Sequence, residues 1–145
     1  RLVNAASGGN YYNVGDITDI HNYPEPKMLF YNPNQSNVLG EYGGIGLAIE
    51  NHLWQSDKNW GYVKYKSSEK ATDEYVNFAN QLLEMVLKGF SGAIYTQTTD
   101  VEGEVNGLIT YDRKIIKLDM ERVKEINKKV IKELPAKFIR IPPNL

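Results

Sequence analysis

Two long amphipathic segments constrain the fold of this chain more than any other feature of its sequence. The first segment begins at Thr72, a good helix-capping residue followed by two acidic residues, and Gly89 ends it. Its apolar residues recur at helical spacing: Tyr75, Ala79, Leu82, Leu83 and Val86. The second segment begins at Asp119, and Pro135 stops it. Its apolar stripe consists of Val123, Ile126, Val130 and Leu134. Both segments predict helices that bury one face in a core.

Four short apolar runs predict strands, at residues 2–7, 16–21, 37–41 and 91–97. Three of these strands precede the first helix, and the fourth lies between the two helices. This order predicts an α/β fold with parallel strands joined by crossovers. The 145 residues suffice for one domain, whereas a complete (β/α)8 barrel needs about 250 residues. The chain is therefore either a small open α/β domain or the C-terminal half of such a barrel.

The composition argues against several classes of partner. Seventeen basic and eighteen acidic residues are interspersed, giving a net charge of −1, so neither nucleic acid nor a membrane surface is a predicted partner. No apolar run approaches the roughly 20 residues of a membrane-spanning helix. Without cysteine the chain has no disulfide or thiol nucleophile, and no compartment is predicted, since periplasmic, secreted and cytoplasmic proteins can all lack cysteine. His21 and His52 lack metal-ligand spacing, so no metal and no cofactor is predicted.

The first candidate for chemistry is Glu41, in the run Val38-Leu39-Gly40-Glu41-Tyr42-Gly43-Gly44-Ile45-Gly46. Apolar residues followed by a glycine-dense turn indicate the end of a buried strand. In α/β barrels the catalytic groups lie at the carboxyl ends of the strands. Glycines at such a turn let the backbone approach a ligand closely. The pattern therefore predicts a carboxylate at the rim of a site.

Four segments in this order, 19–24, 39–44, 91–97 and 106–113, resemble the C-terminal half of the catalytic barrel of family 2 glycoside hydrolases. That family includes β-galactosidases, β-glucuronidases and β-mannosidases. The resemblance covers residues 1–134 as a partial barrel domain and leaves residues 135–145 as a C-terminal tail. It implies that the four predicted strands are the fifth to eighth strands of a (β/α)8 TIM barrel.

The resemblance also implies a function, that of a retaining β-glycosidase acting on β-linked carbohydrate, with β-galactosidase as the leading specificity. Glu41 matches the catalytic nucleophile of the family, and Tyr23 matches a tyrosine that hydrogen-bonds it. Tyr95 takes the place of a tryptophan beneath the sugar in β-galactosidases. The remaining residues that the resemblance implies at the substrate are His21, Asn22 and Asn106.

Two departures from the family pattern accompany the resemblance. The general acid/base of the family is a glutamate at the end of the fourth strand, which would precede Arg1, so we expect it outside this chain. Gly44 occupies a place where some β-galactosidases have a histidine that touches the sugar. We expect this chain alone to be incomplete and inactive. A half-barrel also exposes strand edges, which predicts self-association or pairing with the missing N-terminal half.

Structural roles remain open for each of these residues. His21 is equally compatible with a structural histidine, Tyr95 with a core residue, and Asn106-Gly107 with a hairpin turn. The acidic residues Asp100, Glu102 and Glu104 fit either a solvated loop or a cation site. The alternative function is a non-catalytic α/β fragment that binds sugar or takes part in assembly.

Overall fold

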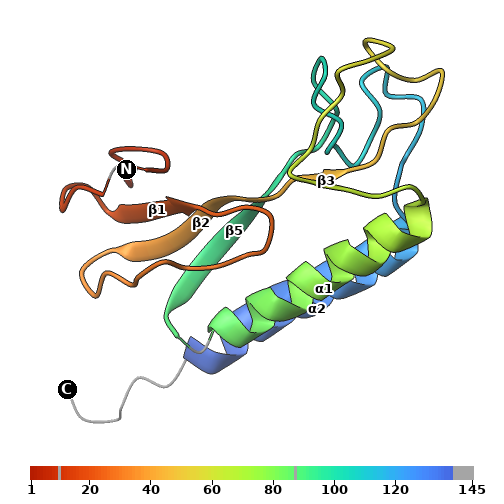
Figure 1. The fold of residues 1–145 in the computed structure, drawn as a ribbon. Helices are drawn as coiled ribbons and strands as arrows, with labels where there is room; N and C mark the ends of the chain where they lie inside the picture. Colours follow the sequence, from red (N-terminus) through yellow and green to blue (C-terminus); the bar gives the residue numbers. More distant parts are fainter. Residues whose placement is uncertain (10, 87, 139–145) are drawn as a thin grey trace.

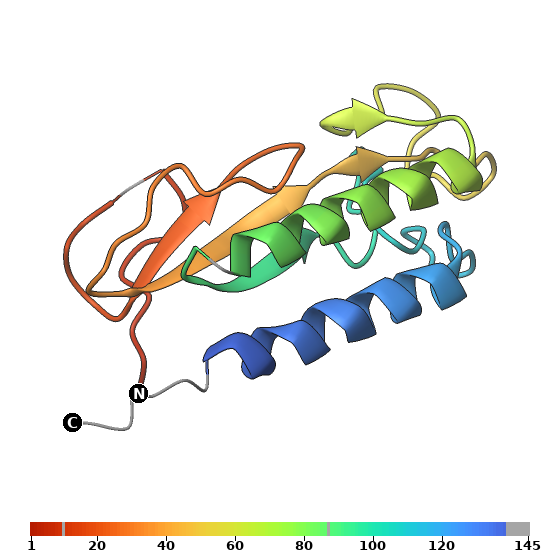
Figure 2. The same cartoon turned by 90° about the horizontal axis from the view of Figure 1, so that it is seen from below.

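The structure is a computed structural model that describes residues 1–9, 11–86 and 88–138. A parallel sheet is formed by β1 (Ile17–His21), β2 (Ser36–Gly43) and β5 (Phe90–Thr96), with β2 in the middle. Two helices, α1 (Ser68–Val86) and α2 (Met120–Phe138), lie side by side along one face of this sheet (Figures 1 and 2). The predicted α/β class with parallel strands is confirmed.

The loops beyond the carboxyl end of the sheet gather into a separate region at one end of the molecule (Figure 1). A second parallel pair lies at the base of this region, formed by β3 (Ile45–Gly46) and β4 (Val63–Lys64). Neither strand was predicted from the sequence, because each has only two residues, too few to show a strand period.

The core lies between the sheet and the two helices. Leu39 of β2 and Phe90 of β5 are almost completely buried, as is Phe78 of α1. The predicted apolar stripes supply much of the remaining core: Tyr75, Ala79, Leu82 and Val86 from α1, and Val123 and Ile126 from α2. Burial of these faces is what holds each helix against the sheet.

Helix α1 begins four residues before the predicted cap at Thr72. Ser67 caps it instead, since its Oγ accepts a hydrogen bond from the backbone N–H of Lys70 at 3.3 Å. Thr72 is fully buried within the helix, where its hydroxyl donates to the Ser68 carbonyl and accepts from the backbone N–H of Asp119. The Thr72 hydroxyl therefore does not cap α1 but links this helix to the residue that precedes α2. Gly89 follows the helix with φ of 92°, as expected of a helix-ending glycine.

Helix α2 begins as predicted and ends later than predicted. The Asp119 carboxylate accepts backbone N–H groups of Glu121 at 3.1 Å and Arg122 at 3.2 Å, which is the geometry of an N-cap. The helix continues through Pro135 to Phe138. A proline removes one backbone donor but does not forbid further turns, so its presence alone does not fix a helix end. Most of the expected tail, residues 139–145, lies outside the described residues.

The strand predicted at residues 2–7 is wrong. Only Asn4 makes a bridge, to Ile17 of β1, and Leu2 and Val3 remain 75% and 51% exposed. The apolar pattern does not produce a strand here because these side chains have no core to pack against. The other three predicted strands correspond to β1, β2 and β5, with ends shifted by one or two residues. The described residues thus include three adjacent parallel strands covered on one face by two helices.

A buried ion pair ties the loop region together. The Lys117 ammonium donates to the Asp100 carboxylate at 2.6 Å and to the carbonyls of Leu47 and Val105, with both charged side chains at most 2% exposed. Burial raises the pKa of Asp100 and lowers that of Lys117, while their mutual attraction acts in the opposite direction. The expectation of a solvated loop or a cation site at this acidic segment is therefore wrong for Asp100, whose partner is a lysine.

The tight turn of this region lies at residues 101–104 and not at Asn106-Gly107. Val101 and Glu104 exchange backbone hydrogen bonds of 3.1 and 2.9 Å, and Glu102 at the tip has φ of 51°. Asn106 is fully buried. The Asn-Gly pair indicated a hairpin by its local preference, but the tertiary hydrogen bonds of this segment place it in the interior.

His52, Thr110 and Asp112 form a second polar cluster in the loop region, and we expect protonation of Asp112 in acid to lower the free energy of unfolding. Hydrogen bonds from Thr110 at 2.6 Å and from His52 at 2.8 Å lower the pKa of Asp112 to about 2. A lowered carboxyl pKa contributes stability above its ordinary value near 3.8, and this contribution is lost as pH falls through about 2. We therefore expect the difference in urea midpoint between the native chain and Asp112→Asn to shrink as pH falls from 4 toward 2. A difference that stays unchanged at pH 2 would contradict the assignment.

Candidate functional site at the strand ends

The candidate site is centred on Glu41, near the carboxyl end of β2. Its Oε2 accepts a hydrogen bond of 2.7 Å from the Tyr23 hydroxyl and lies 3.2 Å from His21 Nδ1. The Glu41 side chain is 42% exposed, so a ligand can reach its carboxylate. The structure thus brings together three of the residues selected from the sequence.

The backbone of two neighbouring strands sets this geometry. β1 and β2 run parallel, and an irregularity between Ile20 and His21 places His21 opposite Glu41. The backbone N–H of Asn22 donates to the Glu41 carbonyl at 3.1 Å, and that of Gly43 donates to the Pro24 carbonyl at 2.9 Å. The segment after β1 therefore stays attached to β2 as far as Pro24, which holds the Tyr23 ring over Glu41. The Tyr23–Pro24 peptide is cis.

Tyr23 is suited to remain a hydrogen-bond donor. Burial raises the pKa of its phenol, a hydrogen bond with Thr96 opposes this, and the hydrogen bond to the Glu41 carboxylate raises the pKa further. Thr96 ends β5, so all three strands of the sheet contribute to the surroundings of this hydroxyl. A protonated phenol facing a carboxylate stabilises the ionised form of the carboxylate.

The Nε2 side of the His21 ring, opposite the side that faces Glu41, contacts Ser7 and Asp19. Its Nε2 lies 3.0 Å from the Ser7 hydroxyl and 3.6 Å from Asp19 Oδ1. With Nδ1 protonated toward Glu41, Nε2 accepts a hydrogen bond from the Ser7 hydroxyl. Asp19 is 6% exposed, and Asn4 donates to its Oδ2 at 2.6 Å. Sequence reasoning missed the contributions of Asn4 and Ser7, which lie on the irregular N-terminal segment.

The glycine-dense turn is used differently from the prediction. A Cβ on Gly40 would collide with the Asp19 carboxylate, and a Cβ on Gly44, whose φ is 64°, would collide with the Tyr62 ring. These glycines make room for the protein's own side chains rather than for a ligand. Tyr62 in turn stacks on Tyr23, with ring centroids 3.7 Å apart and planes 4° from parallel.

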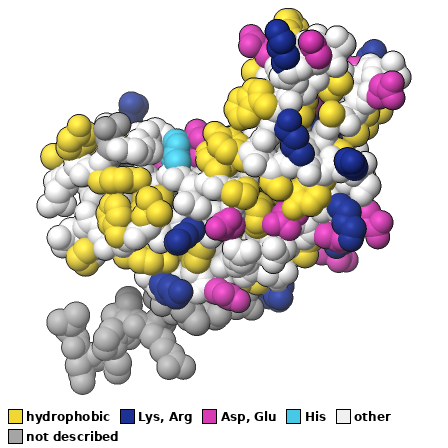
Figure 3. Space-filling model, viewed as in Figure 1, with side chains coloured by type: hydrophobic (Ala, Val, Ile, Leu, Met, Phe, Trp, Pro, Cys, Tyr) yellow, Lys and Arg dark blue, Asp and Glu magenta, His cyan; other side chains and the backbone are white. Residues whose placement is uncertain are grey.

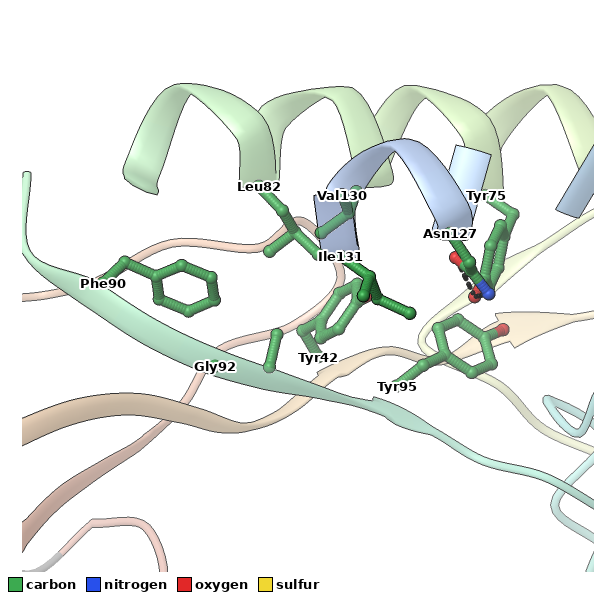
Figure 4. Close-up of a pocket in the computed structure, with 10 residues that line it drawn as sticks. Tyr42, Tyr75, Leu82, Phe90, Gly92, Tyr95, Asn127, Val130 and Ile131 are labelled. Atoms are coloured by element: carbon green, nitrogen blue, oxygen red, sulfur yellow. Dashed lines mark hydrogen bonds between the residues drawn. The ribbon is translucent and has the colours of Figure 1, made fainter. Parts of the chain in front are cut away.

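Tyr95 and Asn106 lie away from the Glu41 carboxylate. Tyr95 points toward the helices, packs against the rings of Tyr42 and Tyr75, and donates to the Asn106 carbonyl at 3.3 Å (Figure 4). The side-chain amide of Asn106 accepts from Gln97 and donates to Glu104, both at 2.9 Å. Strand alternation explains the placement, because Tyr95 and Thr96 are consecutive residues on opposite faces of β5.

Asn22 contributes mainly through its backbone. Its side-chain amide donates to the Glu25 carbonyl at 2.8 Å, which shapes the loop after β1. Within the described part of the chain, no three histidine, aspartate or glutamate side chains are grouped as metal ligands would be. No helix among the described residues has both the length and the apolar character needed to cross a bilayer.

Comparison with known proteins gives one informative result. No family model matches the chain. No curated protein sequence matches it either. Among solved structures, an exo-β-agarase is similar to this chain with a TM-score of 0.54 and 18% sequence identity. The two share a fold. The similarity covers 69% of this chain and 14% of the agarase chain, so this chain corresponds to a small part of that protein.

Proposed function

We propose that this chain is part of the catalytic barrel of a retaining β-glycosidase, with Glu41 as its nucleophile. The observation that carries the proposal is the exposed Glu41 carboxylate at a parallel strand end, with Tyr23 and His21 both within 3.2 Å of one oxygen. A nucleophile must be ionised, and two donors on one side leave the other oxygen free for attack. The similarity of fold to a glycoside hydrolase, the exo-β-agarase, supports this assignment.

The proposed reaction has two steps. The free oxygen of Glu41 attacks the anomeric carbon, the bond to the leaving oxygen breaks, and a second carboxylic acid protonates that oxygen. The same second group, now a carboxylate, then takes a proton from water, which displaces Glu41 and releases the sugar with retained configuration. We propose that the second carboxyl group comes from a segment outside the described residues and lies about 5 Å from Glu41.

The barrel itself is part of the proposal. β1, β2 and β5 would be the sixth, seventh and eighth strands, and α1 and α2 would be the helices that follow the last two. The parallel order β1-β2-β5 and the position of both helices on one face agree with this arrangement. We propose β-galactosides as the leading substrate class, on the resemblance to family 2 glycoside hydrolases.

Covalent trapping tests the function directly. The chain is incubated with 2-deoxy-2-fluoro-β-glycosides carrying a dinitrophenol leaving group, in galacto, gluco, manno and glucurono forms, and its intact mass is measured. This leaving group departs without a general acid, so labelling does not need the second carboxyl group. We expect one adduct, located by peptide sequencing on Glu41, with the galacto reagent. An adduct on another residue, or none on the folded chain or on any longer protein that contains it, would reject Glu41 as nucleophile.

The edge of the sheet at β5 predicts self-association of the isolated chain. In the part that the structure describes, β5 is hydrogen-bonded on one edge alone, and beside it runs an apolar groove lined by Phe90, Gly92, Val130 and Ile131 (Figure 4). Ile131 is 67% exposed there. An unpaired edge beside exposed apolar surface favours association with another strand. We propose that a second copy fills this groove when no other barrel segment does.

Sedimentation of the native chain and of two lysine variants measures this association. We expect the native chain to form dimers at tens of micromolar, and Ile131→Lys to weaken dimerisation by about tenfold or more, the cost of burying an unpaired charge. Leu29→Lys, at a site 52% exposed in the loop before β2, is the control and should leave dimerisation unchanged. A clean monomer at millimolar concentration would contradict the prediction.

A further inference from the structure

An aromatic ledge extends from the candidate nucleophile toward the surface. The Tyr62 ring stacks on Tyr23, the phenol that contacts Glu41, and the Trp60 ring meets Tyr62 edge-on with centroids 5.7 Å apart. We call Trp60 and Tyr62 together the ledge. Tyr62 is 50% exposed and Trp60 is 45% exposed. Figure 3 shows hydrophobic side chains at the surface of this loop region, interleaved with charged ones.

Backbone hydrogen bonds and close packing hold the two residues of the ledge in place. The Trp60 backbone donates to the Gly103 carbonyl and accepts from the Val105 N–H, both at 2.8 Å, which anchors it to the segment after β5. Tyr62 lies next to β4 and against Gly44, where any larger residue would collide with its ring. Fixed, exposed apolar rings are costly to leave in water and have already lost their side-chain entropy, so they are well prepared to bind a sugar ring.

Two carboxylates, those of Glu41 and Glu104, lie close enough to the Tyr62 ring of the ledge to act on its phenol. Glu104 and Glu41 both raise the pKa of the Tyr62 phenol, after the larger effect of its burial. Glu104 is fixed in place by the Asn106 amide, at 2.9 Å. Two carboxylates near the ring disfavour a ligand that carries a carboxylate of its own.

We propose that Trp60 and Tyr62 form a binding site for a neutral sugar ring of a β-linked chain, in the position adjacent to the sugar held at Glu41. The proposal rests on the glycosidase function proposed above and deepens it. The apolar C–H face of the pyranose stacks on the exposed indole ring, and the Tyr62 ring, whose plane lies 70° from that of the indole, flanks the sugar. The sugar hydroxyl groups face water and Glu104. Uronic acid units are excluded at this position by Glu41 and Glu104. The substrate class is therefore a neutral oligosaccharide or polysaccharide rather than a small aryl or alkyl glycoside.

Nuclear magnetic resonance of the two tryptophan indole N–H groups tests the ledge. The ¹⁵N-labelled chain is titrated with cellotriose and β-1,4-galactotriose as neutral probes and with β-1,4-linked triglucuronate as the anionic probe. We expect at least one neutral trisaccharide to shift the Trp60 signal and leave the Trp54 signal in place, and the triglucuronate to shift neither. Trp54 is the matched control because it is 61% exposed and packs on Tyr111 instead of Tyr62. Trp54→Phe assigns the two signals.

Affinity measurements on variants complete the test. Trp60→Ala should weaken neutral trisaccharide binding by about tenfold, whereas Trp54→Phe should change it less than twofold. Glu41→Gln removes the proposed nucleophile and should retain the Trp60 shift, so the ledge and the chemistry are separable. Unchanged affinity in Trp60→Ala, equal binding of the triglucuronate, or no shift with any probe would overturn the ledge. Labelling of Glu41 with no ledge binding would overturn this inference alone, and ledge binding with no labelling would overturn the proposed function alone.

Discussion

Replacing Glu41 by glutamine is expected to abolish covalent labelling by the fluoroglycoside. If the proposed function holds, the same change should lower hydrolysis of β-glycosides by a longer protein that contains this chain by about 10⁴-fold or more, the order seen when a covalent nucleophile is removed. Glutamine has the same size and still accepts a hydrogen bond from Tyr23, so the fold should be retained. Intact mass and initial rates measure the two effects, and an unchanged circular dichroism spectrum verifies folding.

Two further variants make this prediction specific. Glu102→Gln removes an exposed carboxylate from the turn at residues 101–104 and should leave labelling unchanged. Tyr23→Phe removes the 2.7 Å hydrogen bond to Glu41 and should slow labelling by about 10- to 100-fold, in line with roughly 1.5–3 kcal/mol for a hydrogen bond to a charged group. Substantial turnover of unactivated glycosides by Glu41→Gln would rule out its role as nucleophile.

Breaking the buried ion pair is expected to have the largest effect on stability. Lys117→Met leaves the Asp100 carboxylate buried without its cation, and it removes the donor for the carbonyls of Leu47 and Val105. Removing one partner of a buried pair costs about 3–5 kcal/mol of the free energy of unfolding, a large part of the stability of an ordinary domain. Denaturant unfolding followed by tryptophan fluorescence measures the change.

Lys114→Met is the matched control for this prediction. Lys114 lies three residues away, is 73% exposed, and approaches Asp112 only at 3.9 Å, so its loss should change stability by less than about 1 kcal/mol. The double variant Lys117→Met with Asp100→Leu should recover part of the lost stability, because no unpaired charge then remains buried. Equal effects of the two lysine variants would show that the Lys117–Asp100 pair does not hold the loop region together.

The two helices and three of the four predicted strands could be located from sequence because their signals are local. Helical spacing of apolar residues depends only on which face is buried, and α1 and α2 both follow it. The ends were less predictable. Threonine hydroxyls commonly cap helices, and this predicted a cap at Thr72. In the structure the Thr72 hydroxyl contacts the backbone of Asp119 instead, 47 residues away. Leu2 and Val3 have a strand-like pattern, but a strand also needs a neighbour and a core, and neither is encoded in the run itself.

Some residues of the candidate site could likewise be predicted from sequence, and others could not. Glu41 could be selected from sequence because it ends an apolar run before a glycine-dense turn, whereas Tyr23 and His21 were implied by the resemblance to a known family. The direction in which Tyr95 points could not be predicted, since a shift of one residue in the strand exchanges the two faces of β5. The burial of Asn106 could not be predicted either, because it depends on contacts with other segments. Ser7 and Asn4 carry no motif and reach His21 and Asp19 only through the path of an irregular segment.

The sequence by itself determined the α/β class, the segments that become helices, and the carboxylate at the end of β2, because each depends on residue type and local spacing. Only the tertiary structure decided which side chains surround that carboxylate. Tyr62 and Trp60 lie far from Tyr23 in sequence, and it is the packing of Tyr62 against Gly44 and Tyr23 that places the ledge beside Glu41. Contacts between distant segments follow from the summed packing of the whole chain, and no local pattern specifies them.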